Sequence, residues 1–507
     1  MHRRAKGLLA ALLAAHLILV AAVPALAADP LPGDPIISFV ANGGRAFTPD
    51  GDGLGDRLEL IVELSASATV SADVYDWEGL PIVALLPSPS TTFAPGPSPI
   101  YWDGAGAPNG PYLVRLVART DSGAFTRELH VARVVALPYP VNPGAVAIFL
   151  DPGHGGDAPG GTEERLPDGT LIREEVLNLD ISFKLAAMLR ASGIRVSLSR
   201  TEDVPANAAR IDRNGDRRVD GADDYLARID GANRARSDLF VSVHNNSIPG
   251  RKGRTEAFYC GVGCVGSAAN RALAGAILDA HVAALSPLQT PEWQLTVGNP
   301  EFAEAVRNPT DDYLRFRSAT YPPGRHFYIL GPFDRAYRPR ALQMPATLVE
   351  SLALSHPTEL GLLTTPAIRT LLADAYFRGI AAWLANRPLG LRFDPSSSPA
   401  TARVGRTTTI QVRVTNNGTA EVPAGSAIVV GTVARLSPYD GSTSPGSTIG
   451  RAYLREPLLP GTSATVNIDV RPVAAGAALW KVDAVVGGIR TSTRRVPFLQ
   501  LPVTVRR

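Results

Sequence analysis

The chain has 507 residues, 45% of them hydrophobic, enough for about three globular domains of roughly 100 to 200 residues. Its formal net charge is +3, and three of the positive charges (Arg3, Arg4 and Lys6) lie at the extreme N-terminus. Without that segment the net charge falls to about zero. No basic field then remains to suggest binding of nucleic acid.

Residues 1–28 have the features of a secretory signal peptide. Basic residues precede an apolar stretch over 7–23, and the small side chains of Ala25 and Ala27 suit cleavage before Ala28. A membrane anchor is the alternative, but the stretch is short for a transmembrane helix, and no later stretch is long and apolar enough. We therefore expect a secreted, extracytoplasmic protein of the periplasm or cell wall, with no stable membrane span after cleavage.

Residues 35–137 contain short runs of alternating hydrophobic and polar residues, such as 58–62 and 112–117, separated by Pro, Gly and Asp. This pattern predicts an antiparallel β-sandwich. Two stretches, FTPDGDGLGDRLEL and YWDGAGAPNGPYLVRL, resemble the immunoglobulin-like domains appended to secreted and flagellar-hook-type bacterial proteins. The first stretch carries Asp50, Asp52 and Asp56, which are either oxygen ligands for Ca²⁺ or residues of a simple turn.

Prolines then mark residues 138–144 as a linker, and from 145 to 387 strands alternate with amphipathic helices. A helix is expected over 174–192, with Gly193 as the residue that ends it. This alternation predicts an α/β domain with a mainly parallel sheet. The expected strands cover 146–150, 194–199, 238–243, 255–260 and 347–349.

Residues 395–507 return to the alternating pattern, as in 409–414 and 464–470, with a turn at Asn416-Asn417-Gly418. A second β-sandwich is expected there. The predicted fold is therefore an α/β domain flanked by two all-β immunoglobulin-like sandwiches.

Polar side chains follow three of the expected α/β strands directly. His154 comes after the first, His244 after a later one, and Glu350 after another. Functional groups gather at the carboxyl ends of strands in such sheets, and the first helical turn brings Glu174 or Glu175 to the same edge. Two imidazoles and one carboxylate make a catalytic zinc set when a fourth position is left for water.

Six motifs in order resemble the zinc-dependent N-acetylmuramoyl-L-alanine amidases of the type-3 family: LDPGHGG, REEVLNLDI, LSRTED, DYLARIDGANRARSDLFVSVHNN, GRTEAFY and MPATLVESLALSHPTELGLL. The resemblance covers about residues 146–384. It implies that His154, Glu174 and His244 bind zinc and that Glu350 is the catalytic acid/base. Glu174 is preferred over Glu175 because Leu177-Asn178-Leu179 then aligns with the family without a gap.

The resemblance also implies the substrate, peptidoglycan, and the reaction, hydrolysis of the amide between the lactyl group of N-acetylmuramic acid and L-alanine of the stem peptide. Arg210 or Arg228, together with Asn233, is expected to organise the neighbouring loop rather than react.

An acidic insertion departs from the family pattern. Five residues occupy positions 1, 3, 5, 9 and 12 of a Ca²⁺ loop: Asp212, Asn214, Asp216, Asp220 and Asp223. Arg217 occupies position 6, where the sharp turn of such a loop normally requires glycine. The two interpretations are a structural Ca²⁺ site that braces a loop near the substrate groove and a solvated acidic insertion.

A second departure is the connection over 286–344, which is rich in Pro, Arg and aromatic residues and longer than a strand connection needs to be. A lid, an extra substrate-binding subdomain and an occluding segment that makes the enzyme dependent on a protein activator are the alternatives. Within it, His326 is a weaker candidate for substrate contact, and His356 farther on is expected in a turn. Cys260 and Cys264, the only cysteines, are a possible disulfide in an oxidising compartment.

The main alternative function is a non-catalytic or activator-dependent peptidoglycan-binding wall protein. Its weakness is that a pure binder has no need of a zinc-water site. A different zinc amidohydrolase or peptidase is the second alternative, but His-Glu-x-x-His is absent, as is the Gly-x-Ser-x-Gly of serine hydrolases.

Overall fold

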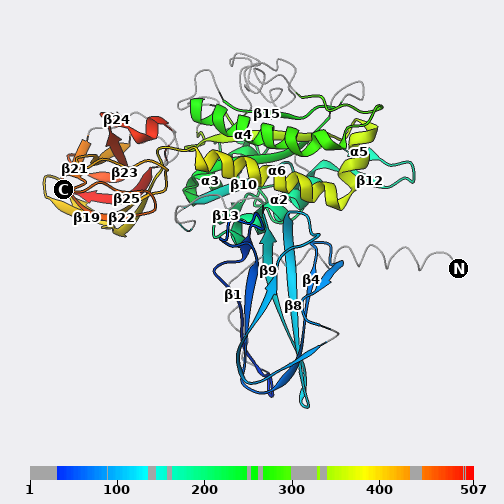
Figure 1. Ribbon diagram of the computed structural model, residues 1–507. Helices are drawn as coiled ribbons and strands as arrows, with labels where there is room; N and C mark the ends of the chain where they lie inside the picture. Colours follow the sequence, from blue (N-terminus) through cyan, green and yellow to red (C-terminus); the bar gives the residue numbers. More distant parts are fainter. Residues whose placement is uncertain are drawn as a thin grey trace. The chain divides into compact units, whose positions relative to one another are not determined.

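The computed structural model (Figure 1) describes residues 31–87, 90–134, 144, 146–156, 163–247, 253–260, 267–297, 328–331, 340–433, 448–494, 496 and 498–507. The chain divides into two compact units, one of residues 1–43, 57–107 and 112–131 and one of 44–56, 108–111 and 132–507. The predicted signal peptide and nearly all of the predicted linker lie outside the described residues. The three predicted domain boundaries stay a prediction.

The N-terminal part of the described chain is all-β. One antiparallel sheet has the order β1 (Ile36–Asn42), β3 (Leu58–Leu64) and β7 (Gly96–Trp102). The other has the order β2 (Ala46–Phe47), β9 (Gly123–Arg133), β8 (Gly110–Thr120), β4 (Ala68–Tyr75) and β5 (Pro81–Ala84), with β6 (Thr91–Phe93) beside β4. Every second residue of β3 and β4 is buried, as the alternating sequence requires. Their immunoglobulin-like identity stays a prediction.

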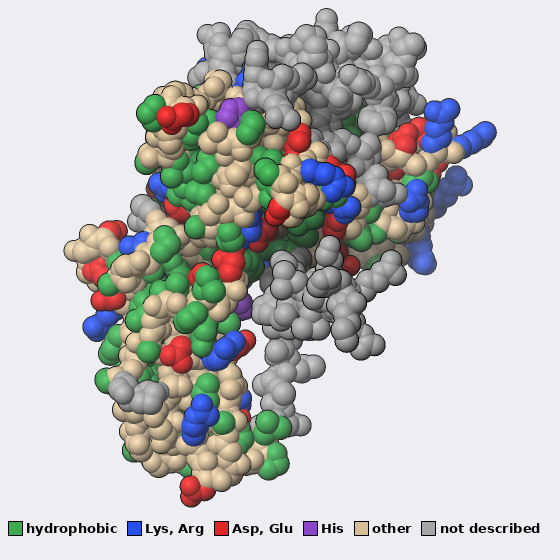
Figure 2. All heavy atoms as spheres, turned by 90° about the vertical axis from the view of Figure 1, so that its right-hand side faces the viewer, with side chains coloured by type: hydrophobic (Ala, Val, Ile, Leu, Met, Phe, Trp, Pro, Cys, Tyr) green, Lys and Arg blue, Asp and Glu red, His purple; other side chains and the backbone are tan. Residues whose placement is uncertain are grey.

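Large hydrophobic side chains of this N-terminal part also reach the surface, among them Ile37, Leu80, Ile82 and Val83. On the face drawn in Figure 2, exposed hydrophobic side chains lie between scattered charged ones of both signs. Among the described residues, no helix is long and apolar enough to cross a membrane.

The α/β part is built on a five-stranded sheet, with the order β13 (Arg195–Leu198), β10 (Ala147–Pro152), β14 (Leu239–Asn246), β16 (Ala346–Ala353) and β15 (Glu256–Phe258). Strand β10 pairs in parallel with β13 and β14, and β14 pairs in parallel with β16. Only β15 is antiparallel to its neighbour. The carboxyl ends of β10, β14 and β16 therefore meet at one edge of the sheet.

Helices cover both faces of this sheet (Figure 1). Ile148 and Leu150 of β10 point into a core shared with α2 (Glu174–Ala191), α4 (Ser267–Leu285) and α6 (Pro366–Ala385). Phe149, between them, points into a second core shared with α3 (Gly221–Ala235). Strands buried on both faces read as continuous apolar runs, which explains the sequences of β10, β14 and β16. Helix α2 matches the helix predicted from the sequence.

The chain continues into a C-terminal sheet with the order β17 (Leu391–Ser397), β19 (Thr408–Asn416), β22 (Ser463–Val470), β21 (Thr448–Tyr453), β20 (Ala427–Val433), β23 (Gly476–Val486), β25 (Leu499–Arg506) and β18 (Thr401–Arg403). A short strand, β24 (Ile489–Arg490), pairs with β23. The buried residues form one hydrophobic core. Strand β17 already begins at Leu391, before the predicted boundary at residue 395.

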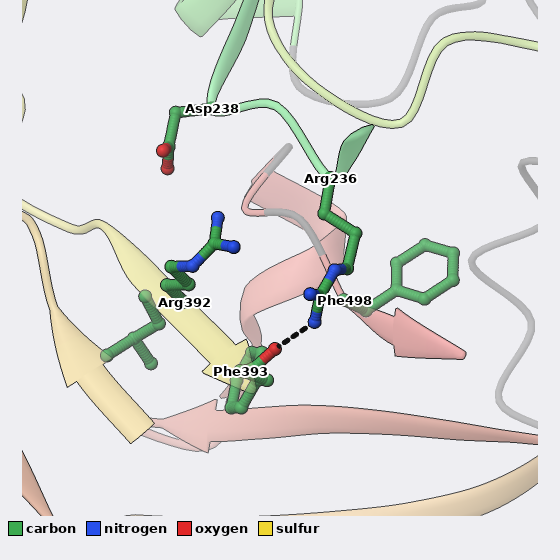
Figure 3. A pocket seen from close by; sticks show the side chains of 6 residues that line it. Arg236, Asp238, Arg392, Phe393 and Phe498 are labelled. Carbon is green, nitrogen blue, oxygen red and sulfur yellow. Dashed lines mark hydrogen bonds between the residues drawn. The ribbon is translucent and has the colours of Figure 1, made fainter. Parts of the chain in front are cut away.

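Buried polar contacts join this sheet to the α/β part. The Asp238 carboxylate accepts hydrogen bonds from the Ala147 amide (2.9 Å), from the Arg387 guanidinium (3.2 Å) and from the Asn417 side chain (2.7 Å). Figure 3 shows a small pocket beside Asp238, where Arg236 donates a 2.8 Å hydrogen bond to the Phe393 carbonyl. These contacts lie near the start of β10, away from the edge at which the strands end.

Candidate active site

The loop after β10 has a conformation that its glycines make possible. A Cβ on Gly153 would lie 2.3 Å from the ring of His244, so only glycine lets the two segments approach. His154 has φ +56°, an uncommon value for a residue with a side chain. The LDPGHGG motif therefore turns one imidazole back toward the strand ends.

Two buried arginines hold this loop through its carbonyl groups. Arg228 donates to the Asp151 carboxylate (2.6 Å), the Pro152 carbonyl (2.8 Å) and the His154 carbonyl (2.6 Å). Arg200 donates to the carbonyls of Pro152 (3.0 Å) and Gly153 (2.9 Å). Of the two arginines that the sequence left open, Arg210 and Arg228, it is Arg228 that contacts this loop. Arg200 had no predicted role, and its only signal was its place in the LSRTED motif.

Glu174, the first residue of α2, lies between the two histidines. Its Oε1 atom is 3.3 Å from His154 Nε2 and 3.1 Å from His244 Nδ1. The two imidazole rings are 4.7 Å apart, at 84° to each other. The exposed fractions are only 5% for His154, 3% for Glu174 and 4% for His244. The structure therefore brings together all three side chains that the sequence proposed as ligands.

Two asparagines without a predicted role fix the Glu174 carboxylate. Asn178, one helical turn later, donates to Glu174 Oε1 (3.1 Å) and to the Gly153 carbonyl (3.3 Å). Asn245 donates through its backbone to Glu174 (3.3 Å) and through its side chain to Asn178 Oδ1 (2.9 Å). Asn178 and Asn245 both lie in the family motifs quoted above. Their contacts could not be read from those motifs, because they join residues that are far apart in the sequence.

The electrostatics of this cluster favour an ionised carboxylate beside a neutral imidazole. Burial opposes ionisation of Glu174, but attraction to His154 and hydrogen bonds with both histidines outweigh it and hold its pKa well below the ordinary value. Burial lowers the pKa of His244. For Glu175, burial raises the pKa, and no ligand-type cluster includes it among the described residues.

Glu350 occupies the strand position next to His244. The two residues are Cα partners in the parallel pairing of β14 with β16, so their side chains leave the sheet on the same face. Glu350 is 8% exposed, and its Oε2 atom is buried. On the other side, its Cα partner is Glu256 of β15, a second carboxylate to which the sequence analysis gave no role. Glu256 accepts a hydrogen bond from Asn246 (2.9 Å), and burial raises its pKa.

The acidic insertion differs from this cluster. Asp212 accepts backbone hydrogen bonds from Gly215 (2.7 Å) and Arg217 (2.8 Å), and Asp223 accepts them from Arg213 and Asp220. Asp220 and Asp223 form the capping box that starts α3. Among the described residues, carboxylate and imidazole atoms converge within 4.8 Å in two groups, the histidine–glutamate cluster and an exposed one of Asp50, Asp52 and Asp56. Calcium at the insertion stays a prediction.

Other predicted residues have structural roles or lie outside the described residues. Asn233 donates to the Ala341 carbonyl and accepts from the Gln343 amide, so it organises that segment and not the His154 loop. His356 caps α5 (Pro357–Thr364) by accepting from the Glu359 amide. Cys260 is buried, whereas Cys264, His326 and most of the 286–344 connection lie outside the described residues.

Comparison with known proteins agrees with this geometry. Residues 148–382 match the model of the family described as N-acetylmuramoyl-L-alanine amidase. The germination-specific N-acetylmuramoyl-L-alanine amidase of Bacillus subtilis is 24% identical over 241 residues, which are 47% of this chain and 80% of the relative. Residues 148–382 are an N-acetylmuramoyl-L-alanine amidase domain. The catalysed reaction is therefore that of a peptidoglycan amidase, as the sequence motifs predicted.

Three further similarities cover less of the related protein or have low TM-scores. The sporulation-specific amidase of the same organism is 33% identical over 107 residues, 20% of this chain and 32% of the relative. The solved amidase Ami1 of Mycobacterium smegmatis is 22% identical over 48% of this chain and all of its own, with a TM-score of 0.32. The CwlD amidase of Clostridioides difficile, solved in complex with the GerS lipoprotein, is 22% identical over 48% of this chain and 99% of its own, with a TM-score of 0.33.

Proposed function

We propose that this chain is a secreted zinc-dependent amidase that cleaves the bond between N-acetylmuramic acid and L-alanine of the peptidoglycan stem peptide. The observation that carries the proposal is the convergence of two buried imidazoles and one ionised carboxylate at the strand ends of an amidase domain. The signal-peptide pattern at residues 1–28 supports the proposal that the enzyme is secreted and acts outside the cytoplasm.

The donor set suits zinc. One oxygen and two nitrogen ligands are typical of catalytic zinc sites, which leave a further position for water or substrate. His154, Glu174 and His244 would hold the ion. The low pKa of Glu174 keeps its carboxylate ionised, and burial keeps the His244 imidazole neutral, which are the protonation states that ligands need. When bound, zinc polarises the scissile carbonyl and makes water acidic enough to react near neutral pH.

The chain's own residues would do the rest. Glu350, beside His244 on the next strand, accepts the proton of the attacking water and passes it to the nitrogen of the departing L-alanine. Asn178 and Asn245 hold Glu174 in place, and Arg200 and Arg228 keep the His154 loop in its turn. Because these supports are made before substrate arrives, the site needs little rearrangement during the reaction.

Three further elements belong to the proposal: immunoglobulin-like identity for the two β-rich parts, a Cys260–Cys264 disulfide, and a protein activator. The disulfide is supported by the bonded state of Cys260, since Cys264 is the only other cysteine of the sequence. A structural Ca²⁺ at the acidic insertion is a fourth, and calorimetric titration of the mature protein with Ca²⁺ tests it, with Asp212→Asn as the variant that should lose binding.

The function is tested by mass spectrometry of the soluble products released from purified peptidoglycan by the mature protein. The assay is run with zinc, with a chelator, and with Glu350→Ala. Stem peptides with a free L-alanine amino group, released only with zinc and intact Glu350, are the expected result. If the protein binds peptidoglycan and releases no such peptide in any condition, it is a wall-binding or activator-dependent protein instead.

A further inference from the structure

A neutral polar network lies behind Glu350, on the opposite face of the sheet. Ser351, the next residue of β16, points toward the helices, where it meets His281 of α4 and Tyr376 of α6. Ser351 Oγ is 3.3 Å from His281 Nε2 and 3.0 Å from the Tyr376 hydroxyl. All three residues are 0% exposed, beside the hydrophobic core that the strands share with α2, α4 and α6. Buried polar groups are costly unless they are hydrogen-bonded, so their presence there needs a reason.

The hydrogen bonds of the network have a defined direction. His281 Nδ1 lies 2.9 Å from the Ile277 carbonyl, which only accepts, so this nitrogen carries the proton and Nε2 is the acceptor. Ser351 Oγ therefore donates to His281 Nε2. The Tyr376 hydroxyl donates toward both Ser351 Oγ and the Val349 carbonyl, and its oxygen lies 3.2 Å from the carbonyl oxygen. Burial lowers the pKa of His281 to about 4, so the imidazole stays neutral.

Tyr376 reaches the two strands that carry the proposed catalytic residues. The Tyr376 hydroxyl donates a hydrogen bond to the carbonyl of Val349, the residue before Glu350. It is also hydrogen-bonded to the backbone of His244. At this point the pairing of β14 with β16 changes register, from His244 with Glu350 to Asn246 with Ala353. A register shift interrupts the backbone ladder and leaves groups that need other partners. The Thr255 hydroxyl satisfies one of them, the Ser351 carbonyl, at 2.8 Å.

We propose that Tyr376, held by Ser351 and His281, is a positioning residue of the amidase that fixes the register of β14 against β16 where these strands present His244 and Glu350. The inference rests on the roles proposed above for those two residues. Without the hydroxyl, the Val349 carbonyl loses a partner just before the register shift. The distance between the proposed metal ligand His244 and the proposed proton acceptor Glu350 is then no longer fixed. Small misplacements of this kind reduce turnover more than they reduce binding.

Tyr376→Phe tests the proposal because it removes one oxygen atom and keeps the ring that contacts His281 at 4.4 Å. Thr347→Val is the matched control, since it removes another fully buried hydroxyl of β16, which donates to the Phe258 carbonyl (2.8 Å) away from the strand ends. For Tyr376→Phe we expect kcat on peptidoglycan fragments to fall about tenfold or more with KM nearly unchanged. For Thr347→Val we expect both constants to stay within about twofold, despite a similar loss of thermal stability.

Hydrogen–deuterium exchange of the metal-free proteins gives a readout that does not depend on activity. Amides of residues 349–354 should exchange faster in Tyr376→Phe than in the wild type or Thr347→Val. Ser351→Ala, which breaks the same network from the strand, should reproduce both effects if Tyr376→Phe does not fold. Unchanged exchange and kcat in either folded variant would overturn the proposal. A wild-type protein that releases no stem peptides would instead contradict the proposed function, and the exchange result would still decide whether Tyr376 fixes the register.

Discussion

The two faces of the sheet at its carboxyl edge use buried polar groups in opposite ways. In front and at the strand ends, Asp151, two arginines and Glu174 from the start of α2 are charged, and each charge is matched by a partner or by the carbonyls of the His154 loop. Behind, Ser351, His281 and Tyr376 form a chain of neutral groups. Charges can bind a metal and move protons, whereas neutral hydrogen bonds fix distances without competing for either. Metal binding and proton transfer are therefore the proposed roles of the charged groups, and positioning of the strands is the proposed role of the neutral network behind them.

The largest expected effect comes from the front face. Glu350→Gln keeps the shape of the side chain and removes its basicity, so kcat should fall by roughly 10²- to 10⁴-fold, as for loss of a general base. Zinc content, measured by inductively coupled plasma mass spectrometry, should stay at the wild-type level because Glu350 is not a proposed ligand. Wild-type turnover in this variant would remove Glu350 from the mechanism.

Arg228→Met should be the most destabilising change. It leaves the Asp151 carboxylate buried without its main cationic partner and frees the Pro152 and His154 carbonyls. Removal of one member of a buried ion pair costs about 3–5 kcal/mol. Urea denaturation followed by circular dichroism measures this loss. A variant as stable as the wild type would show that the guanidinium does not hold the loop.

Gly153→Ala tests the close approach of the two proposed histidine ligands. The added Cβ would meet the His244 ring at 2.3 Å, so one of the segments must move. We expect zinc affinity to fall by about 10- to 100-fold, the range typical of disturbed ligand orientation. Gly275→Ala is the control, because a Cβ at this position of α4 meets nothing within 4 Å. Equal zinc affinities in a competition titration would contradict the account of the loop.

A further expected effect is a pH dependence of stability that belongs to the back face. His281 has a pKa of about 4 in the folded chain and an ordinary value of 6.5, so the unfolded chain binds the proton more readily between these values. The stability it contributes is complete above pH 6.5 and is lost as the pH falls toward 4. His281→Gln has no group that titrates in this range. Between pH 7 and pH 4 its free energy of unfolding should therefore fall by roughly 2–3 kcal/mol less than that of the wild type. Parallel pH profiles of the two proteins in urea denaturation would show that His281 is not buried as described.

Charged residues were predictable because motifs and strand ends mark them. His154, His244 and Glu350 each follow an apolar run, and Glu174 opens an amphipathic helix, so the topology of an α/β sheet already brings them together. For the arginine that organises the loop, the sequence left two candidates, Arg210 and Arg228. What the motifs left unmarked were contacts between segments far apart in the chain, such as Asn178 with Gly153.

The neutral network behind the sheet had no sequence signal at all. Ser351, His281 and Tyr376 come from three elements, and each by itself is typical of a helix or strand interior. Their meeting depends on how β16, α4 and α6 pack against one another, which no periodicity predicts. The acidic insertion is a different case. Its spacing left a Ca²⁺ loop and a solvated insertion as the two interpretations. In the structure Asp212 and Asp223 accept backbone hydrogen bonds, and calcium there stays a prediction.

Zinc binding to the metal-free mature protein, measured by competition with a chromophoric chelator, tests the central claim most directly. The wild type should bind one equivalent tightly, and Glu174→Gln, which keeps the shape of the side chain and loses its charge, should bind at least about 100-fold more weakly. Equal affinity in the two proteins, or no tight equivalent in the wild type, would contradict the assignment of His154, Glu174 and His244 as the metal site.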